Sequence, residues 1–550
     1  MSHANGPRTG RPPTYAPRGM VAAPHVLASA AGLDALQRGG SAVDAAIATN
    51  AVLCVVYPHM AGLGGDGFWL IAGPGCDGVQ ALEASGPSAR AATRDWYRER
   101  GCEREIPARG ALAALTVPGA VDGWRAAHER FGRLPWADLF TAAIEYARDG
   151  MPVSRSLADW LVQDLSILRR QPDTAAIYLP GGEPQREGTR LVQANLARSF
   201  EQLARAGARD FYEGDIPARI CKALAGDGSP LRPEDFAAYR ARWVDPITST
   251  YRGRDIVQMP PSTQGFAALQ ILNLLDGFDV ASWGEGTADY YHHIVEAVKV
   301  AFADRDEWLT DPAFVDIPLD RLLSKDYADQ RRRLIDPRRA SDQFEPGLRF
   351  GDATRRQPPG GDTCYFCAAD ADGLVVSIIQ SIYHDFGSSV VGGDTGILMQ
   401  NRGSFFSLDQ SHPNRLEPGK RTFHTIIPAM MLEGGKPVLA YGTMGGEGQP
   451  QTQAAMVTRM VDFGYDVQQA IEAPRWLMGR TWGTASSNLS LESRIPEEVT
   501  RELTLRGHPV QIVGGWSGTM GHAQAIRIDR DSGFYEGGAD PRGDGAALGY

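Results

Sequence analysis

The chain has 550 residues, a hydrophobic content of 43% and a formal net charge of −11, with acidic and basic residues interspersed. This composition is ordinary for a globular protein with a large core, and it argues against a nucleic-acid-binding protein, which would carry a basic face. Six cysteines are too few for a disulfide scaffold, and no run approaches the roughly 18 apolar residues of a membrane span.

The N-terminal region predicts a tail followed by two helices. Residues 1–18 are rich in Pro, Gly and polar residues, so we expect a disordered tail. They contain no apolar segment of the kind that a secretory signal needs, and we therefore expect a cytoplasmic protein. Residues 25–40 predict a helix. A second helix begins at Ser41, which forms a capping pair with Asp44.

Residues 62–67, GLGGDG, match the letters of a dinucleotide-binding motif. That motif needs a helix after its glycines, whereas the residues that follow, FWLIAGPG, predict a strand. The pattern therefore argues against dinucleotide binding, and we expect no cofactor.

Helical patterns dominate residues 118–330, and the clearest covers residues 287–309. His292 and Glu296 lie four residues apart there, as two metal ligands could. Because the H-E-x-x-H pattern is absent, we interpret them as a surface pair and expect no metal site.

Residues 336–362 are polar, rich in Pro and Gly, and aperiodic, which predicts a long surface loop. Strand-like runs then return, beginning with CYFCAA. Cys364 and Cys367 lie three apart in this predicted strand, so their thiols should point to opposite faces. The whole pattern indicates an α/β protein with sheets covered by helices.

Thr363 lies where this loop meets the strand. A threonine hydroxyl needs a base to act as a nucleophile, and one solution is the residue's own α-amine, which exists only if the chain is cut between Asp362 and Thr363. An α-amine titrates at roughly 7.7–8.0, so it can accept a proton near neutral pH. The alternative is an ordinary β-branched residue at the start of a strand.

The next strand predicts a neighbour for Thr363. A three-residue hairpin loop over residues 371–373 would set a register in which Thr363 lies opposite Ser381. A two-residue loop would instead bring Gln380 or Ile382 across. The first register would place a second hydroxyl beside Thr363.

From about Met20 to Tyr550 the chain resembles the γ-glutamyltranspeptidase family of N-terminal-nucleophile hydrolases. The likeness rests on GGSAVDAAIATNAVLCVVYPHMAGLGGDGFWLI, LTVPGAVDGW, EAVKVAFADRDEWLTDPAFV and GADPRGDGAALGY. It implies a four-layer αββα sandwich and self-cleavage before Thr363. A large segment, residues 19–362, and a small segment, residues 363–550, would then form one intertwined catalytic domain as a heterodimer. Whether that pair dimerises further stays open.

The resemblance also implies catalytic roles. Thr363 would be the nucleophile and Ser381 its hydroxyl neighbour. Gly445 and Gly446, in YGTMGGEGQ, match the family's glycine pair, whose N–H groups form an oxyanion hole. A plain turn is the alternative for these two glycines.

Four departures from the family pattern fall in one predicted pocket. A carboxylate at the position of the family's substrate-binding arginine would repel a substrate carboxylate. We therefore expect the glutamyl clamp to be lost and the substrate to differ. The departures are Glu83 for that arginine, Phe405 for an aspartate that binds the α-amine, Ser381-Ile382-Tyr383 for T-x-N, and His424-Thr425 for a serine pair.

Three further stretches, QSIYHDFGS, QNRGSFFSLD and GKRTFHTIIPAM, together resemble a divergent branch of the family that includes oxamate amidohydrolase. Arg402 and His424 are candidate partners for a substrate carboxylate, Phe405 would shrink or dry the pocket, and Tyr383 and Thr425 complete the predicted substrate site. An exposed surface charge is the alternative for Arg402.

The sequence thus predicts a self-processing amidohydrolase that cleaves a small carboxylate-bearing amide such as oxamate. One alternative is a γ-glutamyl hydrolase or transferase with a rebuilt pocket. Another is a non-catalytic homologue that serves as a binding protein.

Overall fold

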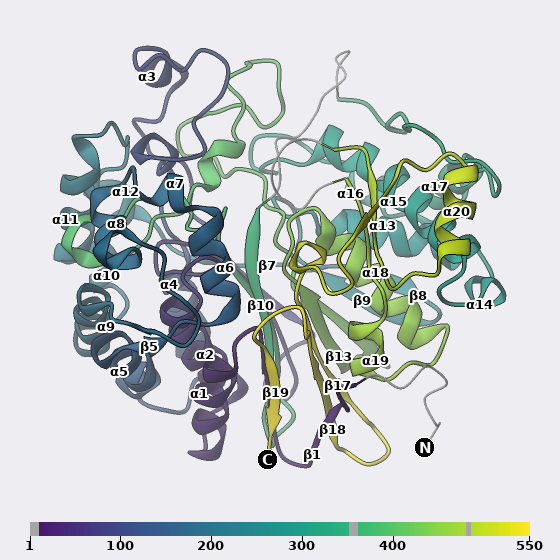
Figure 1. The fold of residues 1–550 in the computed structure, drawn as a ribbon, viewed down its shortest axis with the longest axis horizontal. Helices are drawn as coiled ribbons and strands as arrows, with labels where there is room; N and C mark the ends of the chain where they lie inside the picture. The colour runs from purple at the N-terminus through teal and green to yellow at the C-terminus, as the bar shows by residue number, and fades with distance from the viewer. Residues whose placement is uncertain (1–9, 351–360, 480–485) are drawn as a thin grey trace.

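Two seven-stranded sheets lie face to face, and helices cover the outer face of each (Figure 1). The computed structural model describes residues 10–350, 361–479 and 486–550. One apolar core fills the space between the two sheets. A second, larger core lies between the second sheet and its helices, and a third lies between the first sheet and its helices. This architecture confirms the predicted four-layer αββα sandwich.

Each large sheet contains strands from before and from after residue 362. The first sheet has the order β1 (Thr14–Ala16), β18 (Tyr535–Ala539), β17 (Ala523–Ile528), β13 (Lys436–Thr443), β12 (Ala429–Glu433), β9 (Arg254–Gln258), β8 (Ile247–Tyr251). The second has the order β19 (Ala546–Gly549), β2 (Met20–Ala23), β10 (Asp362–Ala369), β11 (Val375–Tyr383), β3 (Asp66–Ala72), β4 (Gln80–Ala84), β7 (Arg242–Val244). Smaller sheets join β14 (Trp476–Met478), β15 (Leu489–Glu492) and β16 (Val510–Val513), and β5 (Met151–Pro152) with β6 (Arg190–Leu191).

The helices form two groups on either side of the strands (Figure 1). The group beside the second sheet comprises α1 (Val26–Gln37), α2 (Ala42–Val56), α4 (Ala120–Phe131), α5 (Thr141–Asp149), α6 (Arg155–Gln163), α7 (Leu165–Leu168), α8 (Pro172–Tyr178), α9 (Ala194–Ala206), α10 (Asp210–Glu213), α11 (Asp215–Ala225) and α12 (Pro233–Ala238). The group beside the first sheet comprises α13 (Gly265–Asp276), α14 (Val280–Trp283), α15 (Ala288–Trp308), α16 (Leu319–Leu322), α17 (Lys325–Arg332), α18 (Gly448–Val461), α19 (Val467–Glu472) and α20 (Glu497–Leu505). The short α3 (Arg94–Arg98) lies at the edge of the molecule.

Helix α2 shows how the sequence sets one of these layers. Ser41 accepts a hydrogen bond from the Asp44 N–H, and the Asp44 carboxylate accepts one from the Ser41 N–H. This reciprocal pair confirms the predicted cap. Every residue of α2 is buried, as expected for a helix that is apolar on all sides.

Strand β10 separates two cores. Cys364 belongs to the core between the second sheet and its helices, and Cys367 belongs to the core between the two sheets. Their thiols therefore point to opposite faces, as predicted. Burial raises the pKa of Cys367 to about 12, so this thiol stays protonated at neutral pH.

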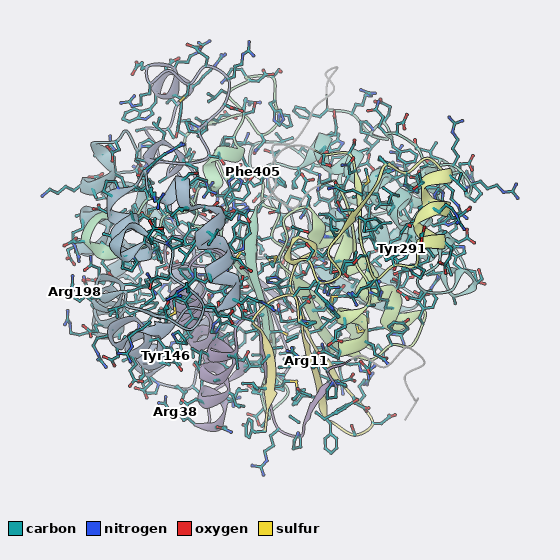
Figure 2. The ribbon with its side chains drawn as sticks, in the orientation of Figure 1. Arg11, Arg38, Tyr146, Arg198, Tyr291 and Phe405 are labelled. Carbon is teal, nitrogen blue, oxygen red and sulfur yellow. The ribbon has the colours of Figure 1, made fainter. Side chains whose placement is uncertain are left out.

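Two predictions are wrong: one is the disorder expected for residues 1–18, of which residues 1–9 lie outside the described residues, and the other is the exposure of two side chains. Residues 14–16 of the predicted tail form β1, which pairs with β18, and Arg11 (Figure 2) donates to the Ala539 and Gly545 carbonyls. His292 and Glu296 are fully buried. They are buried because residues 336–341 and His508 cover this part of α15. His292 contacts His508, and Glu296 pairs with Lys299.

Residues 336–350 of the predicted loop contain no helix or strand, and residues 351–360 lie outside the described residues. Across the ranges that the structure describes, no helix combines the length and apolarity needed to cross a membrane.

Candidate active site

The β10–β11 hairpin has the register predicted from its three-residue loop. Asp370 N donates to Leu374 O over 3.0 Å, and the pairing continues back along the strands to Cys364 opposite Gln380. Carried one residue further, this register places Thr363 opposite Ser381.

A bulge interrupts the ladder at that point. Asp362 pairs with Tyr383, whereas the regular register would pair it with Ile382. Thr363 therefore lies at the bulge, where the regular pairing ends, and only the extrapolated register places it opposite Ser381. Bulges of this kind are common beside active sites, where they redirect a side chain.

Thr363 is fully buried, and its Oγ1 has no hydrogen-bond partner among the described residues. Such a buried hydroxyl normally has a partner, so its lack of one suggests a reactive role. Gly361 packs against Tyr383, and a Cβ added to Gly361 would overlap the Tyr383 ring and carbonyl. Tyr383 itself has a φ of 81°, which is unusual for a bulky residue and typical of functional sites.

Ser381 links this bulge to a buried cation. Its Oγ accepts a hydrogen bond from the Tyr383 N–H at 2.8 Å and another from Arg402 Nη2 at 2.9 Å. A hydroxyl has two acceptor lone pairs and one donor. In both of these contacts the Ser381 hydroxyl is the acceptor.

Arg402 is fully buried, which contradicts the alternative of an exposed surface charge. Its Nε and Nη1 have no hydrogen-bond partner in the part of the chain that the structure describes. The guanidinium lies 4.6 Å from the centre of the Tyr383 ring and 5.7 Å from that of Phe405. Burial lowers the pKa of Arg402 to about 10, with the Asp66 charge opposing this shift. The group thus remains a cation at neutral pH.

Asp66 is a site residue that the sequence analysis did not identify. It pairs with Ser381 across β3 and β11. Its Oδ1 accepts from the N–H groups of Gly86 and Gly119, at 3.3 and 3.0 Å, and its Oδ2 contacts His424 Nε2 at 3.2 Å. The available signal was the acidic residue within GLGGDG, which drew attention only as part of a nucleotide motif.

His424 is fully buried between two oxygen acceptors. Its Nδ1 lies 2.9 Å from the Thr422 carbonyl, and its Nε2 contacts Asp66. Burial lowers the pKa of His424, the hydrogen bond to Asp66 raises it, and the Arg402 charge lowers it again. A neutral imidazole carries one N–H, and oxygens already face both ring nitrogens, so Arg402 offers the better N–H groups for a substrate carboxylate.

The remaining predicted pocket residues line this cluster. The Phe405 ring (Figure 2) lies 4.2 Å from that of Tyr383 and 4.4 Å from that of Phe423, so the three rings form an apolar wall. Thr425 is buried, and its hydroxyl lacks a partner among the described residues.

Glu83 is ion-paired rather than open to a substrate. Its carboxylate lies 2.6 Å from Arg242 and 3.2 Å from Arg421, and it accepts a hydrogen bond from Ser85. The repulsion expected from this residue is therefore reduced by two neighbouring cations.

Gly445 and Gly446 form a tight turn, residues 444–447, which we name the oxyanion turn after the role predicted for its glycines. Their φ values are 117° and 48°, which glycine adopts without strain. The Met444 carbonyl accepts from the Thr443 hydroxyl at 2.8 Å, and the Gly445 carbonyl accepts from Gly448 N at 2.7 Å. Because a trans peptide holds its C=O and N–H antiparallel, these bonds also fix the directions of the Gly445 and Gly446 N–H groups.

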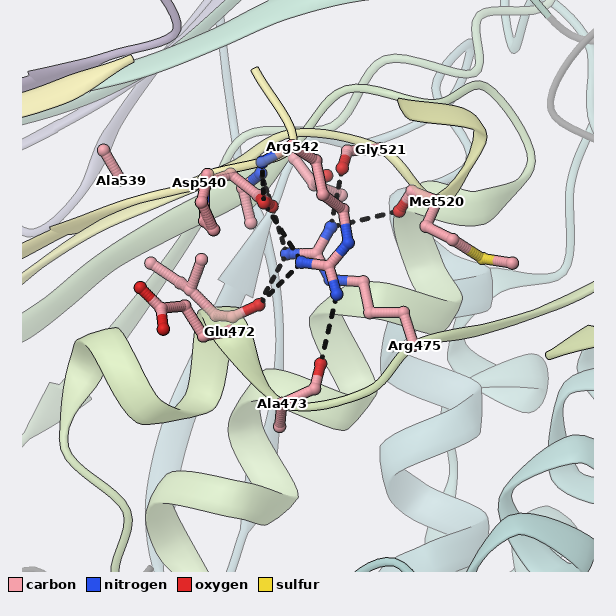
Figure 3. A network of polar contacts seen from close by, with 12 residues as sticks. Glu472, Ala473, Arg475, Met520, Gly521, Ala539, Asp540 and Arg542 are labelled. Carbon is pink, nitrogen blue, oxygen red and sulfur yellow. Dashed lines mark hydrogen bonds and ion pairs between the residues drawn. The ribbon is translucent and has the colours of Figure 1, made fainter. Parts of the chain in front are cut away.

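A buried network of polar contacts, shown in Figure 3, includes Gly521, which lies against Met444 of the oxyanion turn. Arg475 donates to the carbonyls of Met520 and Gly521, at 3.0 and 2.8 Å, and pairs with Asp540. A Cβ on Gly521 would overlap the Met444 carbonyl oxygen. The network therefore holds the segment on which the oxyanion turn rests.

Within the described ranges, no group of three or more His, Cys, Asp or Glu side chains could hold a metal ion.

Comparison with known proteins identifies the family. Residues 28–550 match the family described as gamma-glutamyltranspeptidase. The chain belongs to this family. It is 48% identical over 530 residues to the glutathione hydrolase-like YwrD proenzyme of Bacillus subtilis, covering 96% of this chain and 98% of the relative. It is 43% identical to the oxamate amidohydrolase proenzyme of Klebsiella pneumoniae subsp. pneumoniae, covering 97% and 98%.

The fold agrees with this membership. The solved cephalosporin acylase from Bacillus halodurans has a TM-score of 0.91 and 36% identity, covering 100% of this chain and 99% of that structure. Members of the gamma-glutamyltranspeptidase family are self-processing amide hydrolases with a large and a small subunit. The protein is therefore an N-terminal-nucleophile hydrolase.

Proposed function

We propose that this enzyme hydrolyses a small amide that carries a carboxylate, such as oxamate, through an acyl ester of Thr363. The observation that carries the proposal is Arg402, a fully buried cation with two N–H-bearing nitrogens, Nε and Nη1, that lack a partner among the described residues. A buried charge of this kind is costly unless an anion pairs with it. A planar guanidinium also matches the geometry of a carboxylate.

The chemistry would begin with a cut between Asp362 and Thr363, which creates the α-amine. In the uncut chain, Gly361 packs against Tyr383, so the residues before the cut must leave before a substrate reaches this wall. The α-amine would then take the Thr363 hydroxyl proton while Oγ1 attacks the amide carbon.

The Gly445 and Gly446 N–H groups would stabilise the negative charge that develops on the carbonyl oxygen. The C–N bond then breaks, and the amine leaves with the proton held by the α-amine. Water, activated by the same α-amine, would hydrolyse the acyl-threonine ester and restore the free Thr363 hydroxyl.

A γ-glutamyl substrate fits this site less well, although one relative is named a glutathione hydrolase-like proenzyme. Such a substrate carries an α-ammonium group as well as an α-carboxylate. Phe405 stands where the family has an acid for that ammonium, and Asp66 already accepts from two backbone N–H groups and contacts His424. Leaving the ammonium unpaired costs several kcal/mol, which is about a thousandfold in rate.

Self-cleaved protein should be tested against oxamate, a γ-glutamyl anilide, glutathione and an acylated cephalosporin, with released amine or ammonia as the readout. The proposal predicts the highest kcat/KM for oxamate or another small carboxylate-bearing amide. A higher kcat/KM for glutathione or the anilide would support the γ-glutamyl alternative instead. Fully cleaved protein without any turnover would support a binding protein.

A further inference from the structure

The side chain of Gln264 connects two loops of the candidate active site. Its Nε2 donates to the Thr425 carbonyl at 2.6 Å and to the Gly446 carbonyl at 3.0 Å. Thr425 lies in the loop that also contains His424, here named the substrate loop, and Gly446 lies in the oxyanion turn. Gln264 is fully buried, so water does not compete for these bonds.

The backbone around Gln264 strengthens the same connection. Gln264 N donates to the His424 carbonyl at 3.0 Å, and His424 N donates to the Ser262 carbonyl at 2.8 Å. The substrate loop is therefore held by both the main chain and the side chain of this segment.

Arg305 fixes the orientation of the Gln264 amide. Its Nη1 donates to Gln264 Oε1 at 3.1 Å. Since a guanidinium can only donate, the amide oxygen must face Arg305 and both N–H groups must face the two loops. Arg305 is itself buried and held by Asp306 at 2.6 Å, and Glu447 of the oxyanion turn lies 3.7 Å from it.

We propose that Gln264 is a positioning residue that holds the substrate loop and the oxyanion turn at a fixed separation, and that Arg305 sets its orientation. The inference rests on the proposed function, because it assigns both loops to one catalytic site. Both residues precede the predicted cut, whereas both loops follow it. The large segment would thus set the geometry in which the small segment reacts.

The consequence is a specific kinetic effect. Without the Gln264 amide, the Thr425 and Gly446 carbonyls lose their shared donor, and the oxyanion N–H groups lose their alignment to the substrate. Removing a whole oxyanion donor lowers kcat by about 100- to 1,000-fold. We expect a smaller loss, about ten- to a hundredfold, when the donors remain but are misplaced.

Gln264→Leu should be compared with Gln270→Leu, a matched control. Gln270 is a buried glutamine of α13 whose Nε2 also donates twice, to Asp304 at 3.1 Å and to the Leu322 carbonyl at 3.2 Å. We expect both variants to lower Tm, and only Gln264→Leu to lower kcat at least tenfold. Equal kcat values for the two variants, or parent-like kcat in Gln264→Leu, would overturn the inference.

Rates should be measured on the preferred amide and also on p-nitrophenyl acetate, an activated ester that needs no carboxylate recognition. Parent protein that hydrolyses the ester but no amide would refute the proposed function, while the ester rates would still test Gln264. If Gln264→Leu does not fold, Gln264→Glu and Arg305→Lys replace it. Both should lower kcat on the ester, and parent-like rates in both would overturn the inference.

Discussion

The guanidinium of Arg402 donates a 2.9 Å hydrogen bond to the hydroxyl of Ser381. The buried cation proposed to bind a substrate carboxylate is thus joined directly to the residue opposite the proposed nucleophile. Arg402 and the Tyr383 N–H both approach the accepting side of Ser381. The proposed substrate cation and the residue proposed to orient the nucleophile are therefore in direct contact.

We expect the Ser381 hydroxyl to donate to Thr363 Oγ1 in the cut enzyme, a bond that the uncut chain does not make. Ser381→Ala should then lower kcat by about ten- to a hundredfold, since a hydrogen bond to a reacting group contributes about 1.5–3 kcal/mol. Ser377→Ala is the matched control: Ser377 is buried in the same strand and bonds to Tyr365 and the Ala429 carbonyl, away from Thr363. Steady-state kinetics on fully cleaved proteins would check this. Equal rates in the two variants would argue against the role of Ser381.

Arg402→Lys should raise KM for a carboxylate-bearing amide by tenfold or more, because a lysine cannot present two planar N–H groups to a carboxylate. Arg402→Ala should raise it further. On p-nitrophenyl acetate, which has no carboxylate, KM should change less than on the amide. A similar rise in KM on both substrates would instead mean that Arg402 acts only through Ser381.

Thr363→Ala should abolish both self-cleavage and turnover, because one hydroxyl serves both steps. Intact-mass measurement should find segments of 362 and 188 residues in the parent, since 550 − 362 = 188, and only full-length chain in the variant. Active protein with an uncut chain would refute Thr363 as a terminal nucleophile.

Gly361→Ala should slow self-cleavage, because a Cβ at this position overlaps the Tyr383 ring and carbonyl and would displace the neighbouring scissile peptide. Gly226→Ala is a suitable control, since a Cβ at Gly226 meets no atom within 4 Å. Pulse-chase analysis by gel would give the two cleavage rates. Parent-like cleavage in Gly361→Ala would show that this contact does not position the bond.

The features predictable from the sequence were those that short stretches encode. The three-residue loop fixed the hairpin register, and the apolar residues of β10 fixed which face each cysteine occupies. These outcomes depend on neighbours within about ten residues.

Features formed by distant segments were missed. Strand β1 pairs Thr14 with Gly537, and no local pattern in a Pro-rich tail indicates such a partner. Gln264 binds the Gly446 carbonyl, 182 residues further along the chain. Asp66 belongs to the candidate site only because the fold brings it next to Ser381 and His424.

The last prediction concerns acid stability. Burial is the largest cause of a lowered pKa in seven histidines. The pKa falls to about 4 in His25 and His522 and to about 3 in His508. The other four are His59, His292, His293 and His424. In the unfolded chain each would take up a proton near pH 6.5, whereas in the folded chain each does so only at lower pH.

The unfolded state therefore binds more protons below pH 6.5, so the free energy of unfolding should fall as the pH falls from about 6.5 towards 5. Each such histidine contributes up to about 1.4 kcal/mol per pH unit within this window. Thermal unfolding from pH 7.5 to 5.0 should show a steep loss of Tm. His508→Gln should have a shallower dependence, because it removes one of these groups. A Tm that stays constant or rises over this range would contradict the assignment of neutral buried histidines.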